Sequence, residues 1–201
     1  MLASGAPPAV VLPVGAELDD PADVVRRLGE PLAVRSSAVG EDARDRSGAG
    51  QYETVLGVEE SGLRDAVSTV RASAANARAR LYGAGDAMAV VIQRQVQTTR
   101  AGVAFSHDPV SGADEVLVES ALGGGETGVS GTVTPDRYRI TDEHVRARAV
   151  GTVRTLRDDE ARRICRLVRR AADGFGAPVD VEFCFDGRTL WLVQCRPITT
   201  L

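Results

Sequence analysis

The sequence has 201 residues, of which 43% are hydrophobic and 26% are charged, so it can bury a core as one domain or as two small lobes. Its formal net charge of −4 excludes a protein that binds nucleic acid or an anionic membrane mainly through positive charge. The chain contains arginine but no lysine, which excludes any mechanism that needs a lysine amine from this chain.

The three cysteines, Cys165, Cys184 and Cys195, are widely spaced and form no C-x-x-C pair. This spacing predicts neither a zinc site nor a disulfide framework, and it favours a reducing compartment. The first residues lack the basic segment of a signal peptide, and no apolar run reaches the length of a membrane span. We therefore expect a cytoplasmic protein with no nucleic-acid or membrane partner.

In the first part of the chain, Asp20 and Pro21 predict a helix start and Gly29 its end. Residues 31–37 predict a short strand that carries Arg35. The glycine-bearing segment 47–51 could lay backbone N–H groups against phosphate oxygens, although a plain turn between strands explains it as well.

Apolar residues at intervals of three and four predict an amphipathic helix over residues 61–82. Its other side carries Arg64, Arg71 and Arg78, which indicate a solvated face more readily than a contact with an acidic partner. Residues 87–93 predict a buried strand. We expect the boundary between two lobes just before this strand, giving lobes of residues 1–86 and 87–201.

The second part predicts strands over residues 101–105, 115–120, 137–141 and 145–150, and a helix over residues 157–174. Five glycines among residues 123–131 indicate backbone that approaches a ligand or a moving lid. His107 beside Asp108 suggests a catalytic base or phosphate acceptor. A hydrogen-bonded turn histidine is the commoner explanation for this pattern.

The last strands, residues 179–185 and 190–196, predict a β-hairpin with one polar and one apolar face. If residues 185–187 form a three-residue loop, the even-numbered residues of both strands share a face. That face then carries Asp180, Glu182, Gln194 and Arg196, together with Cys184, Leu190 and Leu192. A hairpin with one wet side is the simpler interpretation. However, two carboxylates and an amide suit Mg²⁺, and a guanidinium suits phosphate.

Five segments in this order resemble the ATP-binding domain of the pyruvate phosphate dikinase, phosphoenolpyruvate synthase and rifampicin phosphotransferase family. They are Pro31-Leu-Ala-Val-Arg-Ser-Ser-Ala38, Gly48-Ala-Gly-Gln-Tyr-Glu-Thr54, Ala101-Gly-Val-Ala-Phe-Ser-His-Asp-Pro-Val-Ser-Gly112, Val129-Ser-Gly-Thr-Val-Thr-Pro-Asp-Arg-Tyr138, and Val179-Asp-Val-Glu182 with Gln194-Cys-Arg-Pro-Ile-Thr199. Together they cover nearly everything from Pro31 to Thr199.

The resemblance implies an α+β ATP-grasp fold that holds Mg-ATP between two lobes with mainly antiparallel sheets and flanking helices. It implies catalytic roles at the phosphates for Arg35 and Arg196, with the metal held by Asp180, Glu182 and Gln194. The nucleotide would contact residues from both lobes: Arg35, Gly50, Gln51, Thr54, Gln93, Glu182, Gln194 and Arg196. Gln93 would lie beside the adenine.

The sequence departs from the family pattern in three ways. It lacks the Lys-Gly-x-Asn segment near the start, its region between residues 16 and 30 is short, and it lacks the Gly-Gly-x-Thr-Ser-His signature of a phosphohistidine domain. We therefore expect an Mg-ATP-binding component of a phosphotransferase whose partner chain carries the phosphohistidine and acceptor domains. The alternatives are a self-sufficient small kinase or ligase and an inactive nucleotide-binding or regulatory fragment.

Overall fold

The computed structural model describes residues 4–38, 53–73, 88–123, 134–141, 144–149 and 154–198. The chain divides into two compact units: Pro7–Gln95, and Val96–Leu201 together with Met1–Ala6. In the described residues, each unit combines a mainly antiparallel sheet with helical structure on one face, so the predicted α+β class is confirmed. In the part of the chain that is described, no helix is both long enough and apolar enough to cross a bilayer.

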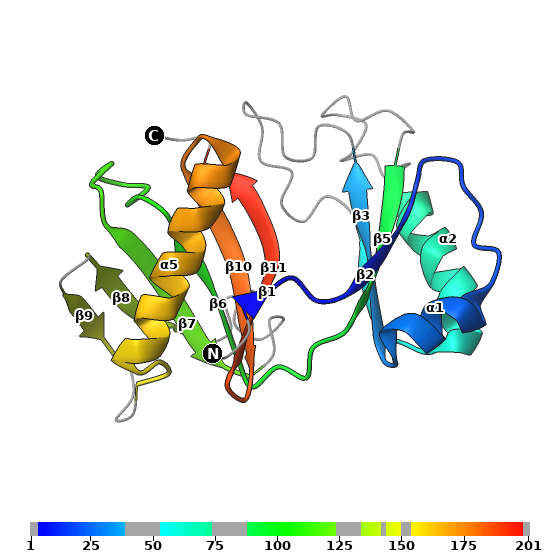
Figure 1. Ribbon diagram of the computed structural model, residues 1–201, viewed down its shortest axis with the longest axis horizontal. Helices are drawn as coiled ribbons and strands as arrows, with labels where there is room; N and C mark the ends of the chain where they lie inside the picture. Colours follow the sequence, from blue (N-terminus) through cyan, green and yellow to red (C-terminus); the bar gives the residue numbers. More distant parts are fainter. Residues whose placement is uncertain are drawn as a thin grey trace. The chain divides into compact units, whose positions relative to one another are not determined.

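The Pro7–Gln95 unit contains a four-stranded sheet with the strand order β2-β5-β3-β4 among its described residues. Its elements are β2 (Ala9–Leu12), α1 (Pro21–Leu28), β3 (Leu32–Ala38), β4 (Thr54–Val58), the 3-10 helix η1 (Glu60–Gly62), α2 (Leu63–Ser73) and β5 (Met88–Arg94). Helices α1 and α2 cover the same face of this sheet (Figure 1).

Local sequence signals determine the ends of α1. The side chain of Asp20 accepts a hydrogen bond from the backbone N–H of Asp23 at 3.1 Å, and Pro21 occupies the first turn. Gly29 ends the helix with a φ of 78°, which favours glycine. These bounds confirm the prediction from the sequence.

Helix α2 occupies the start of the predicted 61–82 helix, after the 3-10 turn. Two of its expected surface arginines bind the chain that precedes α1: Arg64 donates to the backbone carbonyls of Leu18 and Asp19, and Arg71 donates to that of Ala16. These contacts attach an otherwise irregular segment to the helix. Arg78 lies outside the described residues.

Strand β5 belongs to the first unit, whereas the expected boundary before residue 87 placed it in the second lobe. The strand lies in the middle of the sheet, with β2 on one side and β3 on the other. This double pairing joins it to the first unit, and the division falls after Gln95.

The other unit contains a seven-stranded sheet among its described residues, with the strand order β1-β11-β10-β6-β7-β8-β9. Its elements are β1 (Ser4–Gly5), β6 (Arg100–Phe105), β7 (Val116–Leu122), β8 (Asp136–Ile140), β9 (Val145–Arg148), α5 (Asp158–Phe175), β10 (Val179–Asp186) and β11 (Thr189–Pro197). All neighbouring strands pair antiparallel except β1 and β11.

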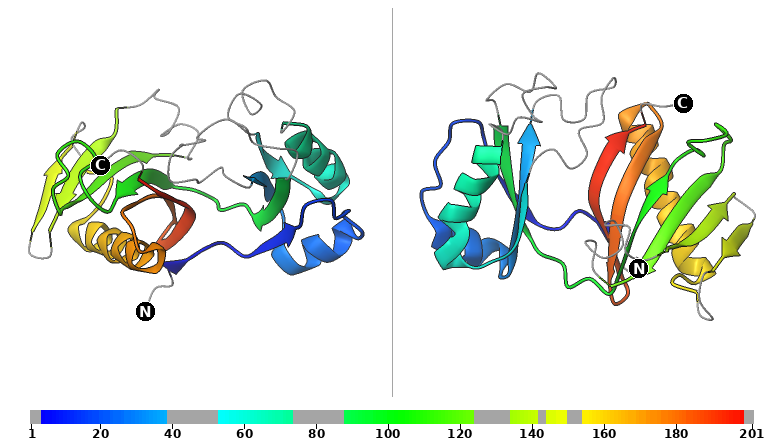
Figure 2. Two further views of the ribbon diagram at one scale, coloured as in Figure 1. Left: turned by 90° about the horizontal axis from the view of Figure 1, so that it is seen from above. Right: turned by 180° about the vertical axis from the view of Figure 1, so that it is seen from behind.

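Helix α5 lies across one face of this sheet (Figure 2). Its buried side, which includes Ile164 and Val168, packs with Val181 and Phe183 of β10 in one core cluster. The opposite face of the sheet is not covered by α5. Because side chains alternate along a strand, the residues between the core positions of β10 emerge on that open face.

Candidate functional site

The C-terminal hairpin turns at Gly187 and Arg188, since Asp186 pairs with Thr189. The expected three-residue loop over residues 185–187 is therefore wrong. Gly187 has the positive φ, 56°, that a two-residue hairpin turn favours. With this turn alone, even-numbered residues of β10 would face odd-numbered residues of β11 along the whole hairpin.

A β-bulge changes this pairing. Phe183 pairs with Leu192 but Glu182 pairs with Gln194, so Val193 is one extra residue on β11. Beyond the bulge, even-numbered residues face each other, and Asp180 pairs with Arg196. The predicted polar group therefore forms, but through a bulge that the sequence analysis did not foresee.

The two-residue turn also changes which face the side chains near it occupy. Leu190 and Leu192 were expected on the polar face. Leu190 instead pairs with Phe185 and is fully buried, and Leu192 packs against the same core. Trp191, expected on the apolar face, pairs with Cys184.

Arg196 binds both carboxylates of the open face. Its Nε lies 3.3 Å from Oδ1 of Asp180, and its Nη2 lies 3.3 Å from Oε1 of Glu182. The side chain of Arg196 is 14% exposed, whereas those of Asp180 and Glu182 are 26% and 27% exposed. The group is thus partly shielded from water and still accessible, and its three charged side chains sum to one negative charge.

The donor chemistry of this group fits Mg²⁺. Magnesium is usually held by one or two carboxylates and keeps other positions for water and substrate phosphates. Asp180 and Glu182 supply two carboxylates, and Gln194, paired with Glu182, supplies an amide oxygen. Among the described residues no set of three or more His, Cys, Asp or Glu side chains could hold a metal ion. An all-protein metal cage is therefore absent from that part of the chain.

The predicted residues of the first unit that are described also share one sheet face. Arg35 pairs with Thr54 across β3 and β4, and Gln93 pairs with Ala33 across β5 and β3. Their neighbours Val34 and Ile92 point into the helix-covered core, so Arg35, Thr54 and Gln93 lie on the opposite face.

Two of these side chains are notable for their burial. Gln93 is only 8% exposed. The Nε atom of Arg35 is buried and has no hydrogen-bond partner within the described ranges. Buried donors are normally satisfied in proteins, so this atom is a candidate for a ligand contact. Gly50 and Gln51 lie outside the described residues.

His107 lies two residues after the end of β6, where its Nδ1 is 3.2 Å from the hydroxyl of Ser106 and its Nε2 is 3.8 Å from Asp114. These contacts agree with a hydrogen-bonded turn histidine. Of the glycine-rich segment 123–131, only Gly123 is described, so its expected approach to a ligand stays a prediction.

The family model of the pyruvate phosphate dikinase AMP/ATP-binding domain matches residues 6–153 and 141–201. A phosphoenolpyruvate synthase from Pyrococcus furiosus is 31% identical over 89% of this chain and 28% of its own length. A rifampicin phosphotransferase from a Streptomyces species is 36% identical over 84% of this chain and 23% of its own length. The chain thus spans about a quarter of the length of these relatives.

Among solved structures, an ATP complex of D-alanine–D-alanine ligase from Bacillus anthracis is similar with a TM-score of 0.53 and 12% identity. The match covers 96% of this chain and 48% of the ligase. At this identity the similarity shows the fold alone, and it agrees with the ATP-grasp fold that the sequence motifs implied. The chain has an ATP-grasp fold and belongs to the pyruvate phosphate dikinase AMP/ATP-binding domain family.

Proposed function

We propose that this chain is the Mg-ATP-binding component of a phosphotransferase. In the proposed reaction, the β-phosphoryl group of ATP passes to a histidine on a partner domain, and water takes the terminal phosphate, leaving AMP and inorganic phosphate. The observation that supports this most directly is the convergence of Asp180, Glu182, Gln194 and Arg196 on one sheet face. Membership of an AMP/ATP-binding domain family supports ATP as the bound nucleotide.

Each residue has a role that its chemistry permits. Asp180, Glu182 and Gln194 would hold Mg²⁺, which would neutralise phosphate charge when bound. Arg196 would exchange its carboxylate contacts for phosphate oxygens, which a guanidinium binds with the same donor geometry. In the first unit, Arg35 and Thr54 would bind phosphate through a guanidinium and a hydroxyl, with Gly50 and Gln51 supplying backbone N–H groups. Gln93 would bind the adenine.

The partner and the cell compartment follow from the same proposal. The phosphoenolpyruvate synthase and the rifampicin phosphotransferase are each about four times as long as this chain, so the rest of their length has room for further domains. A domain with a phosphorylatable histidine and an acceptor-binding domain are the two that the reaction requires. Cytoplasmic ATP and magnesium would supply the substrate.

Calorimetric titration of ATP with and without Mg²⁺ tests the metal site. Glu182→Gln keeps the side-chain volume but removes a charged ligand, so the magnesium-dependent part of ATP affinity should disappear. Asp186→Asn is the matched control, because Asp186 is an exposed carboxylate at the turn of the same hairpin. Unchanged magnesium dependence in Glu182→Gln would contradict the assigned role.

Product analysis with ATP labelled at its β-phosphate tests the reaction. AMP and a labelled histidine that form only when the partner domain is added support the proposal. ADP formed by this chain alone identifies a self-sufficient kinase or ligase instead. The absence of any nucleotide binding identifies an inactive fragment.

A further inference from the structure

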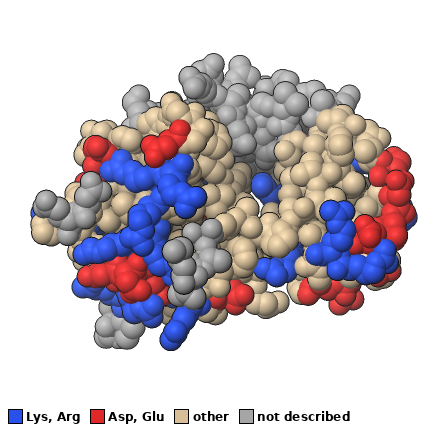
Figure 3. Space-filling view, viewed as in Figure 1, with Lys and Arg blue, Asp and Glu red and all other residues tan. Residues whose placement is uncertain are grey.

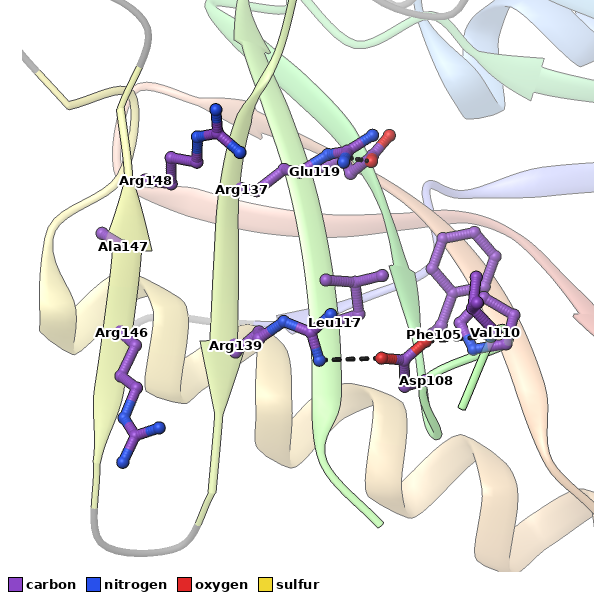
Figure 4. Close-up of a pocket in the computed structure, with 11 residues that line it drawn as sticks. Phe105, Asp108, Val110, Leu117, Glu119, Arg137, Arg139, Arg146, Ala147 and Arg148 are labelled. Atoms are coloured by element: carbon purple, nitrogen blue, oxygen red, sulfur yellow. Dashed lines mark hydrogen bonds and ion pairs between the residues drawn. The ribbon is translucent and has the colours of Figure 1, made fainter. Parts of the chain in front are cut away.

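A pocket of about 450 Å³ lies on the open face of the seven-stranded sheet, over β6 to β9 (Figure 4). Four arginines from two neighbouring strands line it: Arg137 and Arg139 of β8, and Arg146 and Arg148 of β9. The carboxylates Asp108 and Glu119 and several apolar side chains, among them Phe105, complete its lining. The pocket therefore combines a group of arginines with an apolar surface.

The arginines lie directly opposite one another. Arg137 pairs with Arg148, and Arg139 pairs with Arg146, across β8 and β9. Directly opposed residues have Cβ atoms about 4.5–5.5 Å apart, and like charges at this separation destabilise a sheet. Two adjacent arginine pairs thus place like charges opposite each other at this end of the sheet.

Among the described residues, nearby carboxylates form ion pairs with the arginines of β8 but not with those of β9. Nε of Arg137 lies 2.7 Å from Oε1 of Glu119, and Nη1 of Arg139 lies 2.7 Å from Oδ2 of Asp108 (Figure 4). Arg139 also contacts Glu115.

The arginines of β9 are not neutralised. Arg146 and Arg148 are exposed, and within the described residues neither has a hydrogen-bond or ion-pair partner. The four arginines and the three carboxylates Asp108, Glu115 and Glu119 therefore sum to one positive charge. The arginines of β8 are held in place by the carboxylates.

Edge protection does not account for this arrangement. Strand β9 is the last strand of the sheet, and charged residues on an edge strand prevent pairing with another sheet. Acidic residues opposite Arg137 and Arg139 would protect the edge equally well and would also stabilise the strand pair. An anion bound beside these arginines would offset the repulsion between them.

We propose that this pocket binds a small organic anion. The guanidinium groups of Arg146 and Arg148 bind its charged group, and the side chains of Phe105 and Leu117 contact its apolar part. Guanidinium groups bind phosphate and carboxylate through paired hydrogen bonds, so either group satisfies the site. Phe105 pairs with Asp180 of β10, so the pocket adjoins the proposed nucleotide site, but none of its lining residues belongs to that site.

The test is calorimetric titration of the whole chain with phenyl phosphate, phenylacetate and inorganic phosphate. We expect saturable 1:1 binding of at least one aromatic anion, and Arg146→Gln/Arg148→Gln should weaken it by roughly tenfold or more, because charge-assisted hydrogen bonds are lost. The preferred aromatic probe identifies the anionic group as phosphate or carboxylate. Inorganic phosphate should bind more weakly than the aromatic anions, which would support the contact with Phe105 and Leu117. Equal binding would show that this apolar contact does not contribute to affinity.

The matched control is Arg166→Gln/Arg170→Gln. These arginines are also exposed and lie four residues apart on α5. Figure 3 shows basic side chains gathered over that helix. The control should retain wild-type affinity. Equal weakening in both double variants, or displacement of the probe by Mg-ATP, would overturn the proposal. So would the absence of saturable binding by the wild-type chain.

Stability provides a second measurement. Because Arg146→Gln/Arg148→Gln removes two like-charge pairs, its melting temperature without ligand should equal or exceed that of the wild type. A lower melting temperature would show that the arginines stabilise the free fold, and this would contradict the argument for an anion.

Discussion

Arg196 and Asp180 are direct cross-strand partners, and Nε of the arginine lies 3.3 Å from Oδ1 of the aspartate. The same guanidinium contacts Glu182. The guanidinium of Arg196 therefore contacts two carboxylates at once, and these three side chains together keep a net negative charge. A bound divalent cation would remove this excess, and it would also release Arg196 for phosphate.

The first prediction concerns this shared cation. Arg196→Gln should lower the free energy of unfolding by about 1–2 kcal/mol, because it leaves Asp180 and Glu182 on one face without their guanidinium. Magnesium without nucleotide should then raise the melting temperature of the variant more than that of the wild type. Thermal unfolding at several magnesium concentrations measures both effects.

Magnesium-free buffer adjusted with sodium chloride to the same ionic strength is the control. If magnesium stabilises wild type and Arg196→Gln equally, the two carboxylates do not form the metal site.

The second prediction concerns a buried ion pair that supports the sheet beneath α5. Glu160 is 1% exposed and accepts hydrogen bonds from Nη1 and Nη2 of Arg100 at 2.8 and 2.9 Å. Glu160→Gln removes the charge that balances Arg100, and should lower the free energy of unfolding by about 3 kcal/mol. Urea unfolding at neutral pH measures the change. Asp173→Asn, an exposed change on the same helix, should stay within about 0.5 kcal/mol of the wild type.

The third prediction concerns Gly102, which pairs with Ser120 on one side and with Phe183 on the other. A Cβ atom at this position would lie 2.0 Å from the backbone oxygen of Glu119 and 2.9 Å from the ring of Phe183. Gly102→Ala should therefore force β6 and β7 apart and lower the free energy of unfolding by roughly 3 kcal/mol or more.

Gly174→Ala is the contrasting change for this experiment. A Cβ atom there meets nothing within 4 Å and lies in a helix, so the variant should gain up to about 1 kcal/mol. A Gly102→Ala protein as stable as the wild type would show that the two strands can separate at little cost.

The fourth prediction concerns Asp108, whose carboxylate is nearly fully buried. Hydrogen bonds from the backbone N–H of Val110 and from Arg139 lower the pKa of Asp108 from 3.8 to about 2. A lowered folded-state pKa means that the stabilisation is complete above pH 3.8 and is lost as the pH falls through about 2. Carbon-13 NMR titration of the carboxyl group should place its midpoint near the lower value.

Arg139→Gln should raise this midpoint, because the arginine favours the charged form of Asp108. Acid unfolding should then begin at a higher pH than in the wild type. If the midpoint does not move, the backbone N–H groups alone account for the lowered pKa.

Structural features that depend on residues close together in the sequence could be predicted from the sequence alone. Asp20, Pro21 and Gly29 determine the ends of α1 through hydrogen bonds and dihedral preferences within a few residues. The alternation of polar and apolar residues in β10 likewise predicts which side chains enter the core. The order of the family motifs predicted the fold, and the absence of lysine follows directly from the sequence.

Features that depend on pairing between distant segments required the tertiary structure. The two-residue turn and the extra residue Val193 together decide which face Gln194 and Arg196 occupy, and no local signal marks the bulge. The pairing of β5 with both β2 and β3 likewise decides where the first unit ends. The Arg-x-Arg repeats in β8 and β9 are visible in the sequence, but only the register places Arg137 opposite Arg148. A shift of one residue in register moves a side chain to the other face, so long-range pairing decides which charged groups meet.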